Sequence, residues 1–198
     1  MPNLSVDPHR VPYMGLEWNK LIVDQLEFYW DVHLRARLDG LTDDEYFWEP
    51  VAGAWNVRRT DDGVWAMDWT RPEPQPSPVT TIAWRMMHIA ATGFANRASA
   101  FFGEDPWPDV DMNHSARYPA SMPATAADAV AYMERSYLAW MQGIAALDEK
   151  EMARPLGPKG GPYADDSMAA LIVHINREVM HHGGEIGLLR DLYARKYS

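Results

Sequence analysis

Histidine and carboxylate side chains occur in the C-terminal part of the sequence at spacings that suit metal coordination. Glu178 and His182 are four residues apart, so on a helix both side chains leave one face, one turn apart. His88 lies in another apolar segment and could supply a third ligand. Two imidazoles and one carboxylate bind a divalent cation at about 2.0–2.2 Å, and three protein ligands leave a position open. We therefore predict a metal site of the open, catalytic kind.

The reason to expect a cation is the position of these residues in the apolar pattern. The last helical segment has a row at three- and four-residue steps that is apolar at its ends and polar at its centre. A carboxylate or imidazole on an interior face needs a partner, and a cation would compensate for the carboxylate. The row consists of Met168, Leu171, Ile175, Glu178, His182, Glu185, Leu189 and Leu192.

The pattern leaves the ligand set open. His174 precedes Glu178 by four residues, and His181 follows it by three, so both spacings also work on a helix. A small rotation of the helix would exchange His182 for His181. Glu185 could form a salt bridge or could accept a hydrogen bond from an imidazole N–H beside the metal. His181 is our candidate for an acid–base catalyst, and His174 is an alternative.

A reading without metal also fits the spacing. Glu178 would then pair with Arg85 or Arg177, and His88 and His182 would be ordinary interior histidines with hydrogen bonds.

The elements that carry these residues are four helices with three- and four-residue periodicity. They form an all-α fold, a four-helix bundle with long crossover connections, in one domain over residues 1–198. We place Ser77 as the N-cap of the second helix with Pro78 in its first turn, and Asp165 or Asp166 as the cap of the last. Gly183 and Gly184 indicate close helix packing. The helices span about 16–39, 78–102, 125–148 and 166–194.

The interior rows of the first and third helices are apolar. The first row includes His33, and the third is the cleanest bundle-type stripe in the chain. The crossover at 41–77 contains several prolines and is expected to lack a helix of its own. Its four tryptophans are expected to cover the bundle: Trp48, Trp55, Trp65 and Trp69.

Composition excludes several classes of function. The net charge of −10 and the absence of a Lys/Arg cluster exclude nucleic acid and anionic membrane surfaces as expected partners. There is no cysteine, and we find neither a signal peptide nor an apolar stretch of membrane-spanning length. We therefore expect a cytoplasmic protein. A homodimer is left open.

Three separated segments resemble the DinB-like superfamily of four-helix bundles. The segment 176–185, Asn-Arg-Glu-Val-Met-His-His-Gly-Gly-Glu, resembles the C-terminal helix signature of that superfamily. The segment Gly40–Glu45, followed by Trp48, Pro50, Gly53 and Trp55, resembles the stretch after its first helix, and residues 77–91 resemble its second helix.

The resemblance implies a bundle with a metal at its centre, commonly held by three histidines. His88 and His182 match the outer two ligands, and Glu178 takes the place of the middle one. The branch similar to mycothiol-dependent maleylpyruvate isomerase also has glutamate there. The resemblance therefore implies zinc, with nickel, iron or manganese as alternatives, and a low-molecular-weight thiol as substrate of a transferase or isomerase. The other reading is a metal- or small-ligand-binding, stress-related protein without catalysis.

Overall fold

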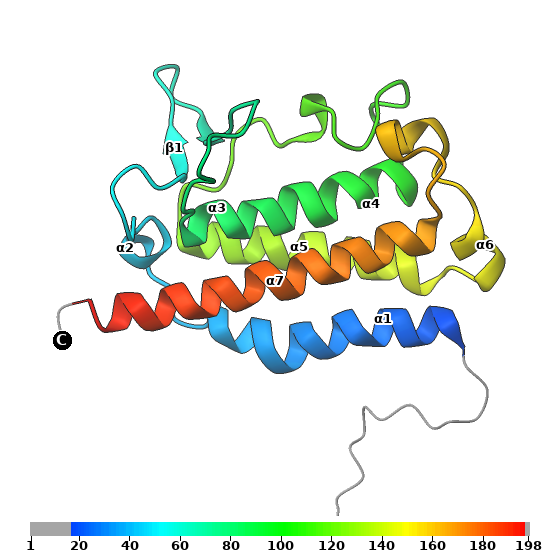
Figure 1. Ribbon diagram of the computed structural model, residues 1–198, viewed down its shortest axis with the longest axis horizontal. Coiled ribbons are helices and arrows are strands. Elements are labelled where there is room, and N and C mark those ends of the chain that lie inside the picture. The colour runs from blue at the N-terminus through cyan, green and yellow to red at the C-terminus, as the bar shows by residue number, and fades with distance from the viewer. Residues whose placement is uncertain (1–16, 197–198) are drawn as a thin grey trace, which may run out of the picture.

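Four long helices form the body of the protein in the computed structural model, which describes residues 17–196. The first and last helices lie side by side at the front and bottom, and the other two lie behind and above them (Figure 1). The first and last helices run in one direction and the middle two run in the other. The predicted all-α bundle is confirmed.

Two of the long helices contain a widened, π-helical turn. The first helix comprises α1 (Trp18–Tyr29), the π-helical η1 (Trp30–Leu34) and the 3-10 segment η2 (Arg35–Leu38). The second comprises α3 (Ile82–Met87), the π-helical η3 (His88–Ala95) and α4 (Asn96–Phe101). The third and fourth helices are α5 (Ala126–Ala145) and α7 (Met168–Ala194).

The π-helical turn in the first helix changes which residues face the core. The Arg35 N–H donates to the carbonyl of Trp30, five residues back, so one extra residue enters the turn. As a result Leu34 is buried and His33 is exposed, which corrects the predicted interior position of His33. The Trp30 ring stacks on Tyr137 of α5 at 4.0 Å between centroids, which joins the two helices at the centre of the core.

The second helix begins four residues later than predicted, so the assignment of Ser77 and Pro78 to its N-terminus is wrong. The Trp55 N–H donates to the carbonyl of Val79, and the Thr81 N–H donates to the carbonyl of Trp55. These two hydrogen bonds hold residues 79–81 in an extended conformation. Thr81 then caps the helix by accepting from the Trp84 N–H.

The other helix ends also differ slightly from expectation. The last helix is capped by Ser167, not by Asp165 or Asp166, because the Ser167 hydroxyl accepts from the Ala170 N–H. The expected start of the first helix at residue 16 lies outside the described residues. The third helix ends at Ala145, and Asp148 starts a separate short helix with a capping box.

The connections contain more regular structure than predicted, and the expectation that the crossover lacks a helix of its own is wrong. The first crossover holds α2 (Asp43–Tyr46) and an antiparallel hairpin of β1 (Val57–Arg59) and β2 (Trp65–Met67), with Arg58 opposite Ala66. The connection before α7 holds α6 (Glu149–Ala153) and the 3-10 segment η5 (Gly157–Tyr163). The segments α2, β1 and β2 lie at one end of the bundle, and α6 and η5 lie at the other (Figure 1).

The loop between α4 and α5 includes η4 (Ser115–Arg117) and is organised by one arginine. The Arg117 side chain has no exposed surface and forms a two-pronged salt bridge with Asp105, at 2.8 and 3.1 Å. It also donates to three backbone carbonyls at 2.7–2.8 Å, those of Asp111, Trp107 and Val110. The guanidinium of Arg117 therefore fixes the conformation of a loop that has little regular structure.

Two adjacent glycines in α7 predict opposite effects on stability. A Cβ on Gly183 would lie 2.6 Å from the hydroxyl of Tyr29, whereas a Cβ on Gly184 would meet nothing within 4 Å. We expect Gly183→Ala to lower the free energy of unfolding by about 1–2 kcal/mol through overpacking. Gly184→Ala should raise it by about 0.5–1 kcal/mol through helix propensity. Urea denaturation of both variants measures this, and an equal response of the two would contradict the close approach of α1 and α7.

None of the helices within residues 17–196 has the length and hydropathy needed to cross a bilayer.

Candidate metal centre

The three predicted ligands come together between the second helix and α7. His88 Nε2 lies 3.7 Å from Glu178 Oε2, and His182 Nε2 lies 3.5 Å from the same oxygen. The two imidazole rings are nearly perpendicular, with centroids 4.8 Å apart. One donor atom from each residue falls within 4.8 Å of the other two, which is a separation that one cation can span.

The cluster lies at the edge of the core and not at its centre. Its side chains are 14–30 % exposed, whereas the neighbouring α7 residues Val179, Gly183 and Ile186 are fully buried. Of the predicted interior row of α7, Met168, Leu171, Ile175 and Leu189 are buried, the three polar members are partly exposed, and Leu192, its last member, is exposed. The three side chains are therefore partly accessible from outside the bundle.

A carboxylate and an arginine orient the His182 ring. His182 Nδ1 lies 2.7 Å from Glu185 Oε2 and 3.3 Å from Arg85 Nη1. The shorter contact places the proton on Nδ1, which donates to Glu185, so the lone pair of Nε2 points to Glu178. Arg85 pairs with Glu185 and holds that carboxylate in place. Carboxylate–histidine pairs of this kind fix the orientation of metal-binding imidazoles.

Protonation states at neutral pH match a metal site. The adjacent His88 imidazole lowers the pKa of Glu178 to about 2, against the opposing effect of burial. Burial lowers the pKa of His182 to about 4, and the charges of His88 and Arg85 act in the same direction. Glu178 is therefore an anion and His182 is neutral, which are the forms that bind metal.

An aromatic stack covers one face of the His88 ring, and the edge of His182 meets the same two rings. The Trp84 indole lies parallel to the His88 ring at 5.0 Å between centroids, and Trp69 stacks on Trp84 at 5.8 Å. The indole Nε1–H of Trp84 donates to the carbonyl of Asp68 in the crossover. Trp69 is half exposed, so this tryptophan borders the site from outside and does not simply cover the core as predicted.

His88 also marks the start of the π-helical segment η3. Its Nδ1 is buried and has no hydrogen-bond partner among the described residues. Widened helical turns occur often at functional sites, and a buried orphan nitrogen calls for a ligand or a proton acceptor.

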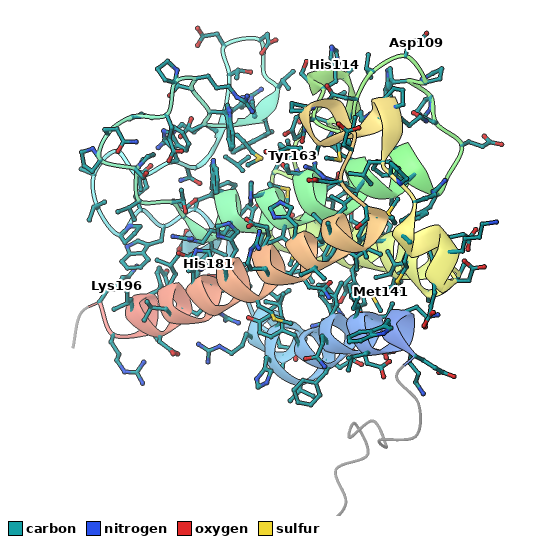
Figure 2. The ribbon with its side chains drawn as sticks, turned by 45° about the vertical axis from the view of Figure 1, so that its right-hand side comes forward. Asp109, His114, Met141, Tyr163, His181 and Lys196 are labelled. Atoms are coloured by element: carbon teal, nitrogen blue, oxygen red, sulfur yellow. The ribbon has the colours of Figure 1, made fainter. Side chains whose placement is uncertain are left out.

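The remaining histidines take different positions. His174 Nδ1 lies 3.7 Å from Glu178 Oε1, on the side of the carboxylate away from His88, and accepts from Arg177 at 2.8 Å. His181, labelled on the outer surface of α7 in Figure 2, is 63 % exposed and faces Glu185 at 3.5 Å. Neither Arg85 nor Arg177 forms a salt bridge with Glu178 within residues 17–196, so the ion pairs of the metal-free reading are not observed.

His181, His182 and Glu185 form a second group of possible ligands. The guanidinium of Arg85 already lies on Glu185, and a cation bound there would meet its charge at close range. The first group has no such competing charge on its shared carboxylate.

The residues present fit a divalent cation. Two imidazole nitrogens converge on one ionised carboxylate, and the ring of His182 is fixed by a hydrogen bond on its far nitrogen. Two nitrogens and one oxygen suit zinc, and also nickel, iron or manganese.

A helical bundle with two histidines and a glutamate on facing helices defines a class of possible metalloproteins. Residues 25–186 match the model of the DinB superfamily, and the chain belongs to that family. Neither the search of curated proteins nor the search of solved structures returned a match.

Sequence reasoning missed two features around the centre. Arg85 was considered only as a partner of Glu178, although it lies three residues before His88 and so on the same face of its helix. The stacking of Trp69 had no sequence signal, because the fold of the crossover decides where that side chain lies.

Proposed function

We propose that this chain is a metal-dependent enzyme that acts on a low-molecular-weight thiol, as a transferase or isomerase. The observation that carries the proposal is the convergence of His88 Nε2 and His182 Nε2 on one oxygen of Glu178. These three residues would hold the ion, with zinc as the first choice. Bound there, a divalent ion supplies Lewis acidity, which lowers the pKa of a thiol or water and polarises a carbonyl.

The surrounding residues prepare the site. Glu185 and Arg85 fix the His182 ring, and Trp84 supports the His88 ring, so both imidazoles are oriented in advance. The partial exposure of all three ligands leaves a path for a small molecule. The resemblance to mycothiol-dependent maleylpyruvate isomerase motivates the choice of a thiol.

A proton acceptor for the thiol is available on either side of the ligands. His181 was the predicted catalyst, but its ring lies beyond His182 on the outer surface. His174, the alternative given by the sequence, lies beside the Glu178 carboxylate and borders a pocket, so we keep it as the second candidate.

The proposal that the substrate is a thiol is tested by a thermal-shift titration of the zinc-loaded protein. Small thiols should raise Tm as their concentration rises, and the corresponding alcohols should not, because an alcohol ionises far less readily. The same titration on His182→Ala is the matched control and should show no thiol-dependent shift. Zinc uptake without any response to thiols would favour the non-catalytic metal-binding function.

The orienting role of Glu185 gives a separate prediction. Glu185→Ala should weaken zinc binding by about 10–100-fold, because the His182 ring loses its hydrogen-bond acceptor and Arg85 is left beside it. Competition with a chromogenic chelator measures the affinity. Glu134→Ala, which removes a surface glutamate paired with Arg35, is the control. Equal affinities of the two variants would show that Glu185 has no part in the metal centre.

A further inference from the structure

A pocket of about 710 Å³ lies beside the metal centre, between the N-terminal half of α7, α4 and the loops above them. His174 connects the pocket to the metal centre, because it lines the pocket and its Nδ1 lies 3.7 Å from Glu178 Oε1. Met112 and Leu156 give the pocket an apolar wall, and Tyr163 of η5 borders it (Figure 2). A molecule bound at the metal could therefore extend into this space.

One buried arginine on the pocket wall has no acidic partner. Arg97 is 6 % exposed, and within residues 17–196 no carboxylate lies within salt-bridge distance of it. It donates to the carbonyls of Thr92 and Met112 and to Asn113 Oδ1, and its Nε has no acceptor in that part of the chain. Asp111 and Glu178 act on Arg97 only from a distance, and burial lowers its pKa below the usual value.

Arg117, which is also buried, has a structural role and serves as a comparison for Arg97. Arg117 lies in the neighbouring loop and is neutralised by the two-pronged contact with Asp105. Buried charges are normally paired in this way, because an unpaired one is costly. Arg97 departs from that rule at a pocket wall, where a ligand could supply the missing negative charge.

A second arginine lines the same pocket from α7. Arg177 is exposed and donates to His174, and it also forms no salt bridge within residues 17–196. Asp166 is the one acidic side chain among the lining residues, so two arginines and one aspartate leave one net positive charge. This balance suits a single negative charge better than a doubly charged phosphate.

We propose that this pocket binds a carboxylate of the substrate through Arg97 and Arg177 while the other end of the molecule reaches the metal centre. Guanidinium groups bind carboxylates through two parallel hydrogen bonds, which gives both charge and orientation. The inference rests on the proposed function for the metal-bound end, and it assigns the substrate class: a thiol that carries a carboxylate.

The test compares ω-mercaptocarboxylic acids of increasing chain length with their neutral amides. Calorimetric titration of the zinc-loaded protein should find one chain length at which the acid binds about tenfold or more tightly than its amide. Arg177→Gln, a change at an exposed residue, should remove most of that preference, and Arg97→Lys should reduce it. Arg135→Gln, a surface arginine at a different pocket, is the control and should retain it.

A second titration tests carboxylate binding in the pocket independently of the metal and the thiol group. Simple alkanoates without sulfur should bind the metal-free protein, and Arg177→Gln should weaken that binding. If they do so while no thiol binds the zinc-loaded protein, the carboxylate pocket stands and the thiol function fails. Equal binding of acid and amide at every chain length, or a preference unchanged in both Arg97→Lys and Arg177→Gln, would overturn the pocket while leaving the thiol function intact.

Discussion

Replacing His182 by alanine is expected to lower the affinity for zinc by at least about 100-fold. The change removes one of the three converging donors and leaves Glu178 Oε2 with one imidazole, that of His88, at 3.7 Å. Loss of a ligand should exceed the roughly 10–100-fold effect of losing an outer hydrogen-bond partner. Elemental analysis after dialysis, followed by chelator competition, measures occupancy and affinity.

The neighbouring histidine provides the matched control. His181→Ala changes the same residue type one position away, on the exposed surface of α7. It should retain the metal, because His181 is not part of the group around Glu178. A protein that binds no divalent metal under any condition, or that loses it equally in both variants, would refute the site.

Replacing Arg117 by methionine is expected to cost about 3–5 kcal/mol of stability. The side chain has no exposed surface, and its loss leaves Asp105 and three backbone carbonyls without their strongest donor. Lys159 still pairs with Asp105 and retains part of the charge balance. Chemical denaturation followed by circular dichroism gives the change in the free energy of unfolding.

An exposed arginine with two acidic partners is the control for this effect. Arg58 pairs with Glu49 and Asp68 at 2.7 and 2.8 Å, but its side chain is 46 % exposed. Arg58→Gln should therefore cost no more than about 1 kcal/mol. If both variants lost the same stability, burial would not be the reason for the effect of Arg117.

The contribution of Arg117 should also depend on pH. Arg117 holds the pKa of Asp105 well below its usual value of about 4. The folded protein therefore keeps Asp105 ionised at a pH at which the unfolded chain takes up a proton. The stability supplied by this pair is complete above about pH 4 and declines as the pH falls. The difference between the wild type and Arg117→Met should narrow in acid.

The sequence predicted the helices and the metal-binding group for the same reason: both follow helical spacing. The row predicted for the third helix is nearly all buried: Met133, Tyr137, Trp140 and Ile144 of α5 and Leu147 just beyond it are buried, and its first member, Val130, is partly buried. The four-residue step from Glu178 to His182 brought both side chains to one face of α7, where they meet His88.

What the sequence did not predict depends on contacts between distant segments. The π-helical turn at Trp30–Leu34 shifts the interior face, and regular spacing carries no sign of it. The start of the second helix is set by Trp55 hydrogen bonds from another part of the chain, which outweighed the local signal of Ser77 and Pro78. The unpaired state of Arg97 could not be inferred, because it depends on where every nearby carboxylate lies.

Several expectations stay predictions. They are the metal identity, the catalytic role of His181, a possible homodimer, the exclusion of nucleic acid as a partner and a cytoplasmic location.

The origin of the ligands in only two helices has a mechanical consequence. His88 comes from the second helix, and Glu178 and His182 come from α7, so one ion would cross-link segments that are far apart in the chain. Because the ion would bind only the folded state, its binding free energy would add to the free energy needed to open either segment. Backbone amides around Val179 and Ala91 should therefore exchange hydrogen for deuterium more slowly in the zinc-loaded protein, and those of the β1–β2 hairpin should be unaffected.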